Sequence, residues 1–355
     1  MESEIMKTIK LLPLISLLLI GSSTLAQVPT VTIGAPSTLI ANSTTEVSFT
    51  ITYTNATSVT LDNTFVSITH TETSGGSITV TGSGTETRSL TISGISGDGN
   101  YTVSINAGSS SNGEESNTGA GPSAAVTVDN TAPSAPSVTG TTPTNDQTPT
   151  WSWTAGGGGN GTFRYGYTDG SDWISEGSVA TEFTPATDLS AAAHTLYVQE
   201  RDAAGNWSTS GSFAIIIDIT PPSAPSVTGT TPTNDQTPTW SWTAGGGGNG
   251  TFRYGYTDGS DWISEGSVAT EYTPATDLSA AAHTLYVQER DAAGNWSTSG
   301  SFAITIDITP PSAPSVTGTT PTNDQTPTWS WTAGGGGNGT FRYGYTDGSD
   351  WISEG

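Results

Sequence analysis

Residues 133–177 read PSAPSVTGTTPTNDQTPTWSWTAGGGGNGTFRYGYTDGSDWISEG, and the same run begins again at Pro222 and at Pro311. The spacing is 89 residues, and the two complete copies differ at only two positions. Near-identity at a fixed period is typical of a string of autonomous modules. It argues against a unique catalytic centre in the repeated part, so we expect no enzyme here.

Aromatic side chains in this run alternate with smaller or polar ones. One residue separates Trp151 from Trp153, and Phe163, Tyr165 and Tyr167 are spaced in the same way. A period of two is that of a β-strand with one buried face, so we expect both tryptophans in a core. Glycine, Asn-Asp and Asp-Gly turn signals separate these runs, and no stretch of ten or more residues has helical spacing. The sequence therefore predicts an all-β fold, with a β-sandwich in each repeat.

The first 26 residues are typical of a secretory signal peptide. Two lysines precede an apolar run over residues 11–20, and the small residues Thr24 and Ala26 suit cleavage before Gln27. This run is shorter than the roughly 20 residues that cross a membrane, and no later stretch approaches that length. We therefore expect a secreted or cell-surface protein with no membrane insertion within this chain.

The composition is strongly acidic and lacks cysteine. The formal net charge is −24, from 8 Lys or Arg against 32 Asp or Glu. Charge of this sign repels phosphate backbones and anionic lipid, so we expect no nucleic acid partner, and cations are favoured instead. Because there are no disulfides, each module depends on core burial, which a bound metal ion would assist.

Two short motifs recur near the end of each repeat. The stretch His194–Pro222 contains an Asp-Ala-Ala-Gly-Asn loop at 202–206 and an Asp-x-Thr-x-Pro linker at 218–222. With these motifs the repeats resemble bacterial Ig-like modules, relatives in shape of fibronectin type III. Such modules occur in tandem in surface adhesins and as spacers in secreted polysaccharide-degrading enzymes. Residues 27–132 resemble a different member of this class, with Asn-Gly-Glu-Glu-Ser-Asn at 112–117 in place of the loop.

The resemblance implies tandem Ig-like β-sandwich domains in a linear array, with the last one incomplete. We predict a signal peptide at 1–26, a distinct bacterial Ig-like domain at 27–132, and complete repeats at 133–221 and 222–310. Residues 311–355 match only the first half of a repeat. We expect the aromatic side chains of this half-module to lack the facing sheet that would cover them.

Carboxylates are expected to meet where one module joins the next. In an Ig-type sandwich the last hairpin loop lies at the same end as the N-terminus, so Asp202 is expected beside the linker that begins at Asp129, and Asp291 beside Asp218. Glu200 lies two residues before Asp202 and shares its face. Three carboxylates with backbone carbonyls and Asn206 form a set of hard oxygen ligands that suits Ca²⁺, and the resemblance implies junctions rigidified in this way. The alternative is a solvated acidic loop. The predicted calcium ligands are Asp129, Glu200, Asp202, Asp218, Glu289 and Asp291.

Other tryptophans are candidates for binding a glycan. Exposed tryptophan stacks on pyranose rings, and Trp173 follows a turn while Trp207 begins the last strand. Only Asn206 stands beside them as a partner for sugar hydroxyls. The glycan candidates are Trp173, Trp207, Trp262 and Trp296.

Two further motifs have ordinary structural explanations. The glycine run 156–159 is not followed by Lys-Ser/Thr, so we predict a flexible loop between strands and not a phosphate loop. His194 and His283 each open a strand, where a ring that bonds a backbone carbonyl would mark a corner of the sandwich. We favour this role over a catalytic triad.

The sequence thus predicts a non-catalytic secreted stalk or adhesin region, in which tandem modules act as spacers. Short proline-rich linkers restrict movement between modules, so the number of copies sets the length of the array. The alternative is a spacer or glycan-binding accessory region of a secreted polysaccharide-degrading enzyme. A third hypothesis is a surface-layer or biofilm matrix protein whose repeats pair laterally. The expected partners are a surface ligand or glycan and the neighbouring modules of a longer polypeptide.

Overall fold

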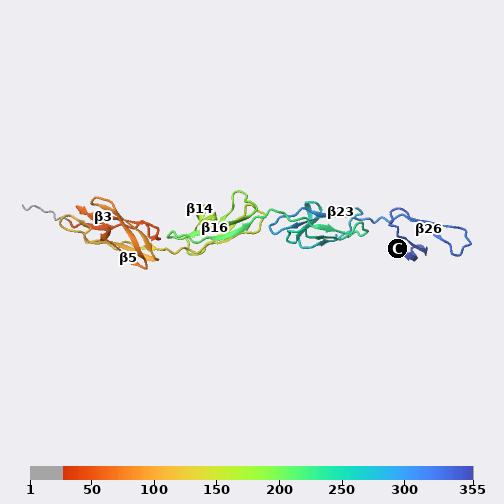
Figure 1. The fold of residues 1–355 in the computed structure, drawn as a ribbon, viewed down its shortest axis with the longest axis horizontal. Coiled ribbons are helices and arrows are strands. Elements are labelled where there is room, and N and C mark those ends of the chain that lie inside the picture. Colours follow the sequence, from red (N-terminus) through yellow and green to blue (C-terminus); the bar gives the residue numbers. More distant parts are fainter. Residues whose placement is uncertain (1–26, 355) are drawn as a thin grey trace, which may run out of the picture. The chain divides into compact units, whose positions relative to one another are not determined.

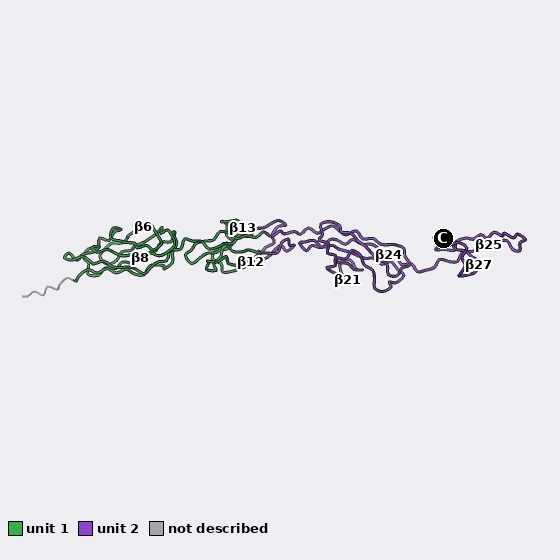
Figure 2. Tube along the Cα trace, turned by 90° about the horizontal axis from the view of Figure 1, so that it is seen from below, with its two compact units in different colours: residues 1–139, 152–182, 196–213 green, residues 140–151, 183–195, 214–355 purple. Residues whose placement is uncertain are grey.

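The computed structural model describes residues 27–354, so the predicted signal peptide lies outside the described part of the chain. The chain divides into two compact units, which Figure 2 colours separately. Of the described residues, unit 1 comprises 27–139, Ser152–Glu182 and Leu196–Phe213, and unit 2 comprises Gly140–Trp151, Phe183–Thr195 and 214–354.

Strands dominate the described residues, and almost all of them pair antiparallel (Figure 1). The one helical element among residues 27–354 is a single 3-10 turn, which confirms the predicted all-β fold. Within the same residues no helix is long and apolar enough to span a bilayer.

The first module lies in unit 1 and is coloured red to orange in Figure 1. Its elements are β1 (Thr30–Ile33), β2 (Ile40–Ala41), β3 (Val47–Thr54), β4 (Ser58–Val59), η1 (Asn63–Phe65), β5 (Val66–Thr71), β6 (Ser74–Thr81), β7 (Thr87–Ser96), β8 (Gly99–Ile105), β9 (Ser110–Ser111) and β10 (Val126–Val128).

Two four-stranded sheets, ordered β1-β3-β7-β6 and β2-β10-β8-β5, enclose the core of this module. On β3, Val47, Phe49, Ile51 and Tyr53 are buried and the residues between them are not. The same alternation continues on β7 and β8. Because successive side chains point to opposite faces, each sheet has one apolar face, and these faces pack together as a sandwich.

The two complete repeats contain the same strands, 89 residues apart. The module boundaries at 133–221 and 222–310 stay a prediction. The first has β11 (Ser137–Thr139), β12 (Trp151–Thr154), β13 (Thr162–Thr168), β14 (Ser171–Ser178), β15 (Glu182–Phe183), β16 (Ala193–Arg201) and β17 (Gly211–Ile216). The second has β18 (Ser226–Thr228), β19 (Trp240–Thr243), β20 (Thr251–Thr257), β21 (Ser260–Ser267), β22 (Glu271–Tyr272), β23 (Ala282–Arg290) and β24 (Gly300–Thr305).

The second repeat lies wholly in unit 2, as a sheet β18-β19-β22 and a sheet β21-β20-β23-β24. Trp240 is fully buried, and its Nε1 donates to the Phe302 carbonyl at 3.0 Å. Trp242 packs against Phe252 and Tyr254 with ring centroids 6.0 and 5.1 Å away. The equivalent tryptophans of the first repeat are also buried, so their predicted place in the core is confirmed.

The half-module leaves its aromatic side chains exposed, as expected. Trp329 is 50% exposed, whereas the identical Trp240 of the complete repeat is 0% exposed. Tyr345 reaches 84%. The strands form two separate two-stranded sheets, β25 (Ser315–Gly318) with β26 (Trp329–Thr332) and β27 (Arg342–Thr346) with β28 (Ser349–Glu354).

Candidate functional site

The Asp-Ala-Ala-Gly-Asn loop of the first repeat closes around a buried aspartate. Asp202 follows β16 and is 4% exposed. Its Oδ1 accepts the backbone N–H groups of Gly205 at 2.6 Å and Asn206 at 2.8 Å. Gly205 has φ +101°, a conformation that favours glycine over residues with a side chain. The carboxylate and the glycine together fix this loop.

Asn206 joins the loop to the linker that precedes the repeat. Its Nδ2 donates to Asp202 Oδ2 and to the Asp129 carbonyl, both at 2.8 Å. The carboxylate of Asp129 accepts the N–H of Thr131 at 2.9 Å. The predicted neighbourhood of Asp202 and Asp129 in unit 1 is therefore confirmed, and the Asn206 amide lies between them. We expected this amide to be a further calcium ligand or a partner for sugar hydroxyls.

The same arrangement recurs in unit 2. Asn295 Nδ2 donates to Asp291 Oδ2 and to the Asp218 carbonyl, again at 2.8 Å. Asp218 accepts the N–H of Thr220 at 2.9 Å. Burial alone would raise the pKa of Asp291, but hydrogen bonds from the Asn295 side chain and from three loop N–H groups outweigh it, so this pKa lies below its usual value. The ionised carboxylate is the form that holds the loop.

Glu200 serves a different loop. It is 1% exposed, and its two carboxylate oxygens accept the N–H groups of Gly156 and Gly161, each at 3.2 Å. A Cβ on Gly159 would lie 2.1 Å from the Glu200 carboxyl carbon. The glycine run, which we expected to be a flexible loop, instead wraps closely around a buried carboxylate. Glu289 does the same in the second repeat.

The predicted calcium ligands thus have separate partners in the structure. Glu200 lies under the glycine run, Asp202 closes its own loop, and Asp129 accepts from the linker backbone. Within residues 27–354, no three His, Cys, Asp or Glu side chains gather as a group that could hold a metal ion. Calcium binding by these residues and their counterparts in the second repeat stays a prediction.

The glycan candidates Trp173 and Trp207 lie on either side of an arginine. The Arg164 guanidinium carbon is 4.6 Å from the ring centroid of Trp173 and 4.3 Å from that of Trp207. Arg201 lies 5.7 Å from the Trp207 centroid. Each such contact contributes on the order of 0.5–2 kcal/mol. In the second repeat, Trp262 and Trp296 stack on Arg253 at 4.6 and 4.4 Å.

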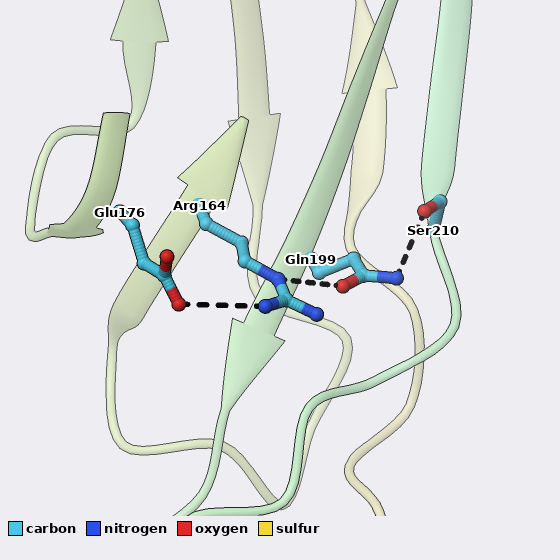
Figure 3. A network of polar contacts seen from close by, with 4 residues as sticks. All are labelled: Arg164, Glu176, Gln199 and Ser210. Atoms are coloured by element: carbon cyan, nitrogen blue, oxygen red, sulfur yellow. Dashed lines mark hydrogen bonds and ion pairs between the residues drawn. The ribbon is translucent and has the colours of Figure 1, made fainter. Parts of the chain in front are cut away.

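Polar contacts with side chains of the neighbouring strands hold this arginine in place (Figure 3). Arg164 Nε donates to Gln199 Oε1 at 2.8 Å, and Gln199 Nε2 donates to Ser210 at 3.1 Å. Glu176 forms an ion pair with Arg164 at 3.4 Å. Sequence reasoning missed this arginine, although its position between Phe163 and Tyr165 indicates that it faces away from the core. Glycan binding by the tryptophans stays a prediction.

The histidines have the predicted structural role. His194 Nε2 lies 2.9 Å from the Ser190 carbonyl, and His283 Nε2 lies 2.9 Å from the Ser279 carbonyl. Each ring therefore bonds a backbone carbonyl just before its own strand begins.

Comparison with known proteins gives similar folds only. No family model and no curated protein sequence matches the chain. Fibronectin(III)-like modules of Clostridium thermocellum CbhA are 16% identical, with 48% of this chain and 93% of that chain covered and a TM-score of 0.31. The FN1-FN3 domains of chicken CNTN1 are 12% identical, with 78% and 99% covered and a TM-score of 0.31. A two-domain fibronectin type III segment of chicken tenascin is 14% identical, with 48% and 98% covered and a TM-score of 0.22.

The fold class rests on the strand pairing itself. In both complete sandwiches described above, two sheets of mainly antiparallel strands enclose a core of alternating inward residues. The described residues therefore form β-sandwich modules that follow one another along the chain, which is the fold that the resemblance to Ig-like modules implies.

Proposed function

We propose that this chain is a non-catalytic extender of a secreted or cell-surface protein, a stalk or adhesin region in which each module adds length. The observation that carries the proposal is that a near-identical module recurs after 89 residues and is tied at its start to the linker before it. A module that repeats with the same chemistry adds reach and no new activity. The leader-like first residues support export.

The linkers support the proposal because hydrogen bonds and close packing hold them against the modules. In the first repeat, Ser134 N–H donates to the Gly157 carbonyl at 3.0 Å. A Cβ on Gly156 would lie 2.2 Å from the Ser134 carbonyl oxygen, and one on Gly211 would lie 1.8 Å from that of Pro136. A linker packed so closely, with prolines that restrict φ, has little freedom to act as a hinge.

Deletion of one whole repeat tests the extender function. Because the two repeats are nearly identical, removing residues 133–221 joins the first module to the second repeat through the same linker sequence. A strand of about ten residues, with a rise of about 3.3 Å per residue, makes a module roughly 35 Å long. The maximum dimension from small-angle scattering should therefore fall by about 35 Å when one repeat is removed. An unchanged dimension would mean that the modules fold back on one another, and the proposal would fail.

A second candidate function is glycan binding by an accessory region of a secreted polysaccharide-degrading enzyme. The observation in its favour is that two tryptophans per repeat lie outside the core around one arginine. Retention on insoluble polysaccharide that is lost in Trp173→Ala and Trp262→Ala together would support it. A chain that passes through every polysaccharide tested would remove it.

A further inference from the structure

In unit 1 the Asp-Ala-Ala-Gly-Asn loop touches the module that precedes it. Asn42, in the turn after β2, donates from Nδ2 to Asn206 Oδ1 at 3.1 Å. Asn42 is 8% exposed, and its Oδ1 accepts the Thr44 N–H and hydroxyl and the Thr45 hydroxyl, at 3.0, 2.8 and 2.9 Å. Its oxygen is thus committed to its own turn, and its amino group faces the next module.

Unit 2 contains the corresponding contact between the first and second repeats. The N–H of Asn145, in the turn before β12, donates to the Ala293 carbonyl at 3.0 Å. A Cβ on Gly294 would lie 3.5 Å from the Asn145 side-chain oxygen. In unit 1 a Cβ on Gly205 would lie 3.5 Å from Asn42 Nδ2. Two modules of different sequence therefore present an asparagine to the same glycine of the loop.

The loop is built to meet a hydrogen-bond donor. Both donors of the Asn206 amide are used, one by Asp202 and one by the Asp129 carbonyl, so its oxygen is the atom left for the preceding module. In unit 2 the atom that accepts a hydrogen bond from the preceding module is the carbonyl oxygen of Ala293, and it too requires a donor. A carboxylate in place of Asn42 would put oxygen against oxygen.

We infer that the Asp-Ala-Ala-Gly-Asn loop is a coupling latch between successive modules, and that its partner is the asparagine-bearing turn of the module before it. The loop carboxylate orients the asparagine amide, the amide holds the linker, and the face of the loop accepts a donor from the preceding module. This inference deepens the proposed extender function, because an extender whose modules are coupled keeps its length. It names a direct protein contact as the source of that coupling.

Spin-label distances on the full chain test the latch, and the absence of native cysteine allows labels at chosen sites. One pair, Thr87→Cys with Ser171→Cys, reports on the junction in unit 1. A second pair, Thr187→Cys with Ser260→Cys, reports on the junction in unit 2. All four positions are exposed, so labelling leaves the cores intact.

The decisive variant is Asn42→Asp, measured in chelator. It keeps the oxygen that Thr44 and Thr45 use and removes the donor to Asn206, so the turn holds while the latch opens. We expect the unlatched population at the first junction to rise roughly five- to tenfold, as the loss of one hydrogen bond entails. The distance distribution of the first pair should broaden and that of the second should not. Asn295→Ala should broaden the distance distribution of the second pair and leave that of the first pair unchanged. Each variant is therefore the control for the other.

Two outcomes would overturn the latch. The first is an unchanged distribution for both Asn42→Asp and Asn206→Ala. The second is a distribution of the native chain that broadens in chelator to the width seen in Asn42→Asp, because a bound ion and not the hydrogen bond would then hold the junction. Unchanged thermal unfolding of Asn42→Asp excludes a folding defect. Scattering after repeat deletion measures module length, so the extender function and the latch can fail separately.

Discussion

The arginine between two tryptophans is the clearest case in which one residue organises a surface. Arg164 stacks on Trp173 and Trp207 and hydrogen-bonds to Gln199 within the same sheet. Arg164→Lys keeps the charge but loses the planar group that stacks and the fixed direction of its N–H groups. We expect it to lower the free energy of unfolding of the first repeat by about 1–2 kcal/mol.

Thermal unfolding followed by tryptophan fluorescence measures this loss. Arg253→Lys should cause the same loss in the second repeat, because its stacking distances are nearly the same. If lysine is as stabilising as arginine at either position, charge alone matters and the stacked geometry contributes nothing.

Asp291 makes the stability of the second repeat depend on pH. Its pKa is lower in the folded state than in the unfolded chain, so the ionised form stabilises the fold fully above the unfolded pKa of about 3.9. That stability is lost as the pH falls through the lower, folded pKa. Asp291→Asn should therefore be less stable than the native chain at pH 7, and the difference should shrink below about pH 4. Thermal unfolding between neutral and acid pH checks this, and a difference independent of pH would contradict it.

At the scale of elements, the glycine loop between β19 and β20 depends on Glu289. Glu289→Gln replaces one acceptor oxygen by an amino group that faces a backbone N–H, so we expect a loss of about 1.5–3 kcal/mol in urea unfolding. Gly248→Ala should cost more than Gly246→Ala. A Cβ on Gly248 would lie 2.1 Å from the Glu289 carboxyl carbon, whereas one on Gly246 meets no atom within 4 Å and is disfavoured only by its φ of +105°. Equal losses would mean that the loop is loosely packed.

At the scale of the whole molecule, residues 311–355 expose aromatic side chains that the complete repeats bury. Trp329 and Tyr345 of this half-module are exposed, and β25 to β28 form sheets of only two strands with open edges. In a chain that stops at residue 355, deleting residues 311–355 should reduce aggregation in light scattering and leave the melting temperature of the two complete repeats unchanged. A lower melting temperature after deletion would show that the half-module stabilises its neighbour.

Calcium gives a second test at this scale. Extracellular calcium modules bind at about 10⁻⁴ to 10⁻³ M, so about 10 mM Ca²⁺ would stabilise an occupied site by about 1.4–2.7 kcal/mol. The calcium prediction therefore expects the melting temperature to rise by about 6–20 °C. The combination of Asp218→Ala with Asp291→Ala should abolish the rise. Identical melting curves in calcium and in chelator would contradict calcium binding. Hydrogen bonds, and no metal ion, would then hold the junction.

The sequence by itself determined the all-β class, the strands with alternating aromatic residues, the core tryptophans and the 89-residue recurrence. Those features depend on neighbours along the chain, because a period of two sets which side chains share a face of a strand. The position of the Asp202 loop beside the Asp129 linker followed from the expected topology.

Only the tertiary structure decided which groups meet. A hydrogen bond joins Asn42 to Asn206, which are 164 residues apart, and Glu200 meets glycines about 40 residues before it. The sequence indicated carboxylates at the junction, but an oxygen that accepts from backbone N–H groups and one that binds a cation look the same in a sequence. Which of the two it becomes depends on the donors that folding brings to it, and those donors come from distant segments.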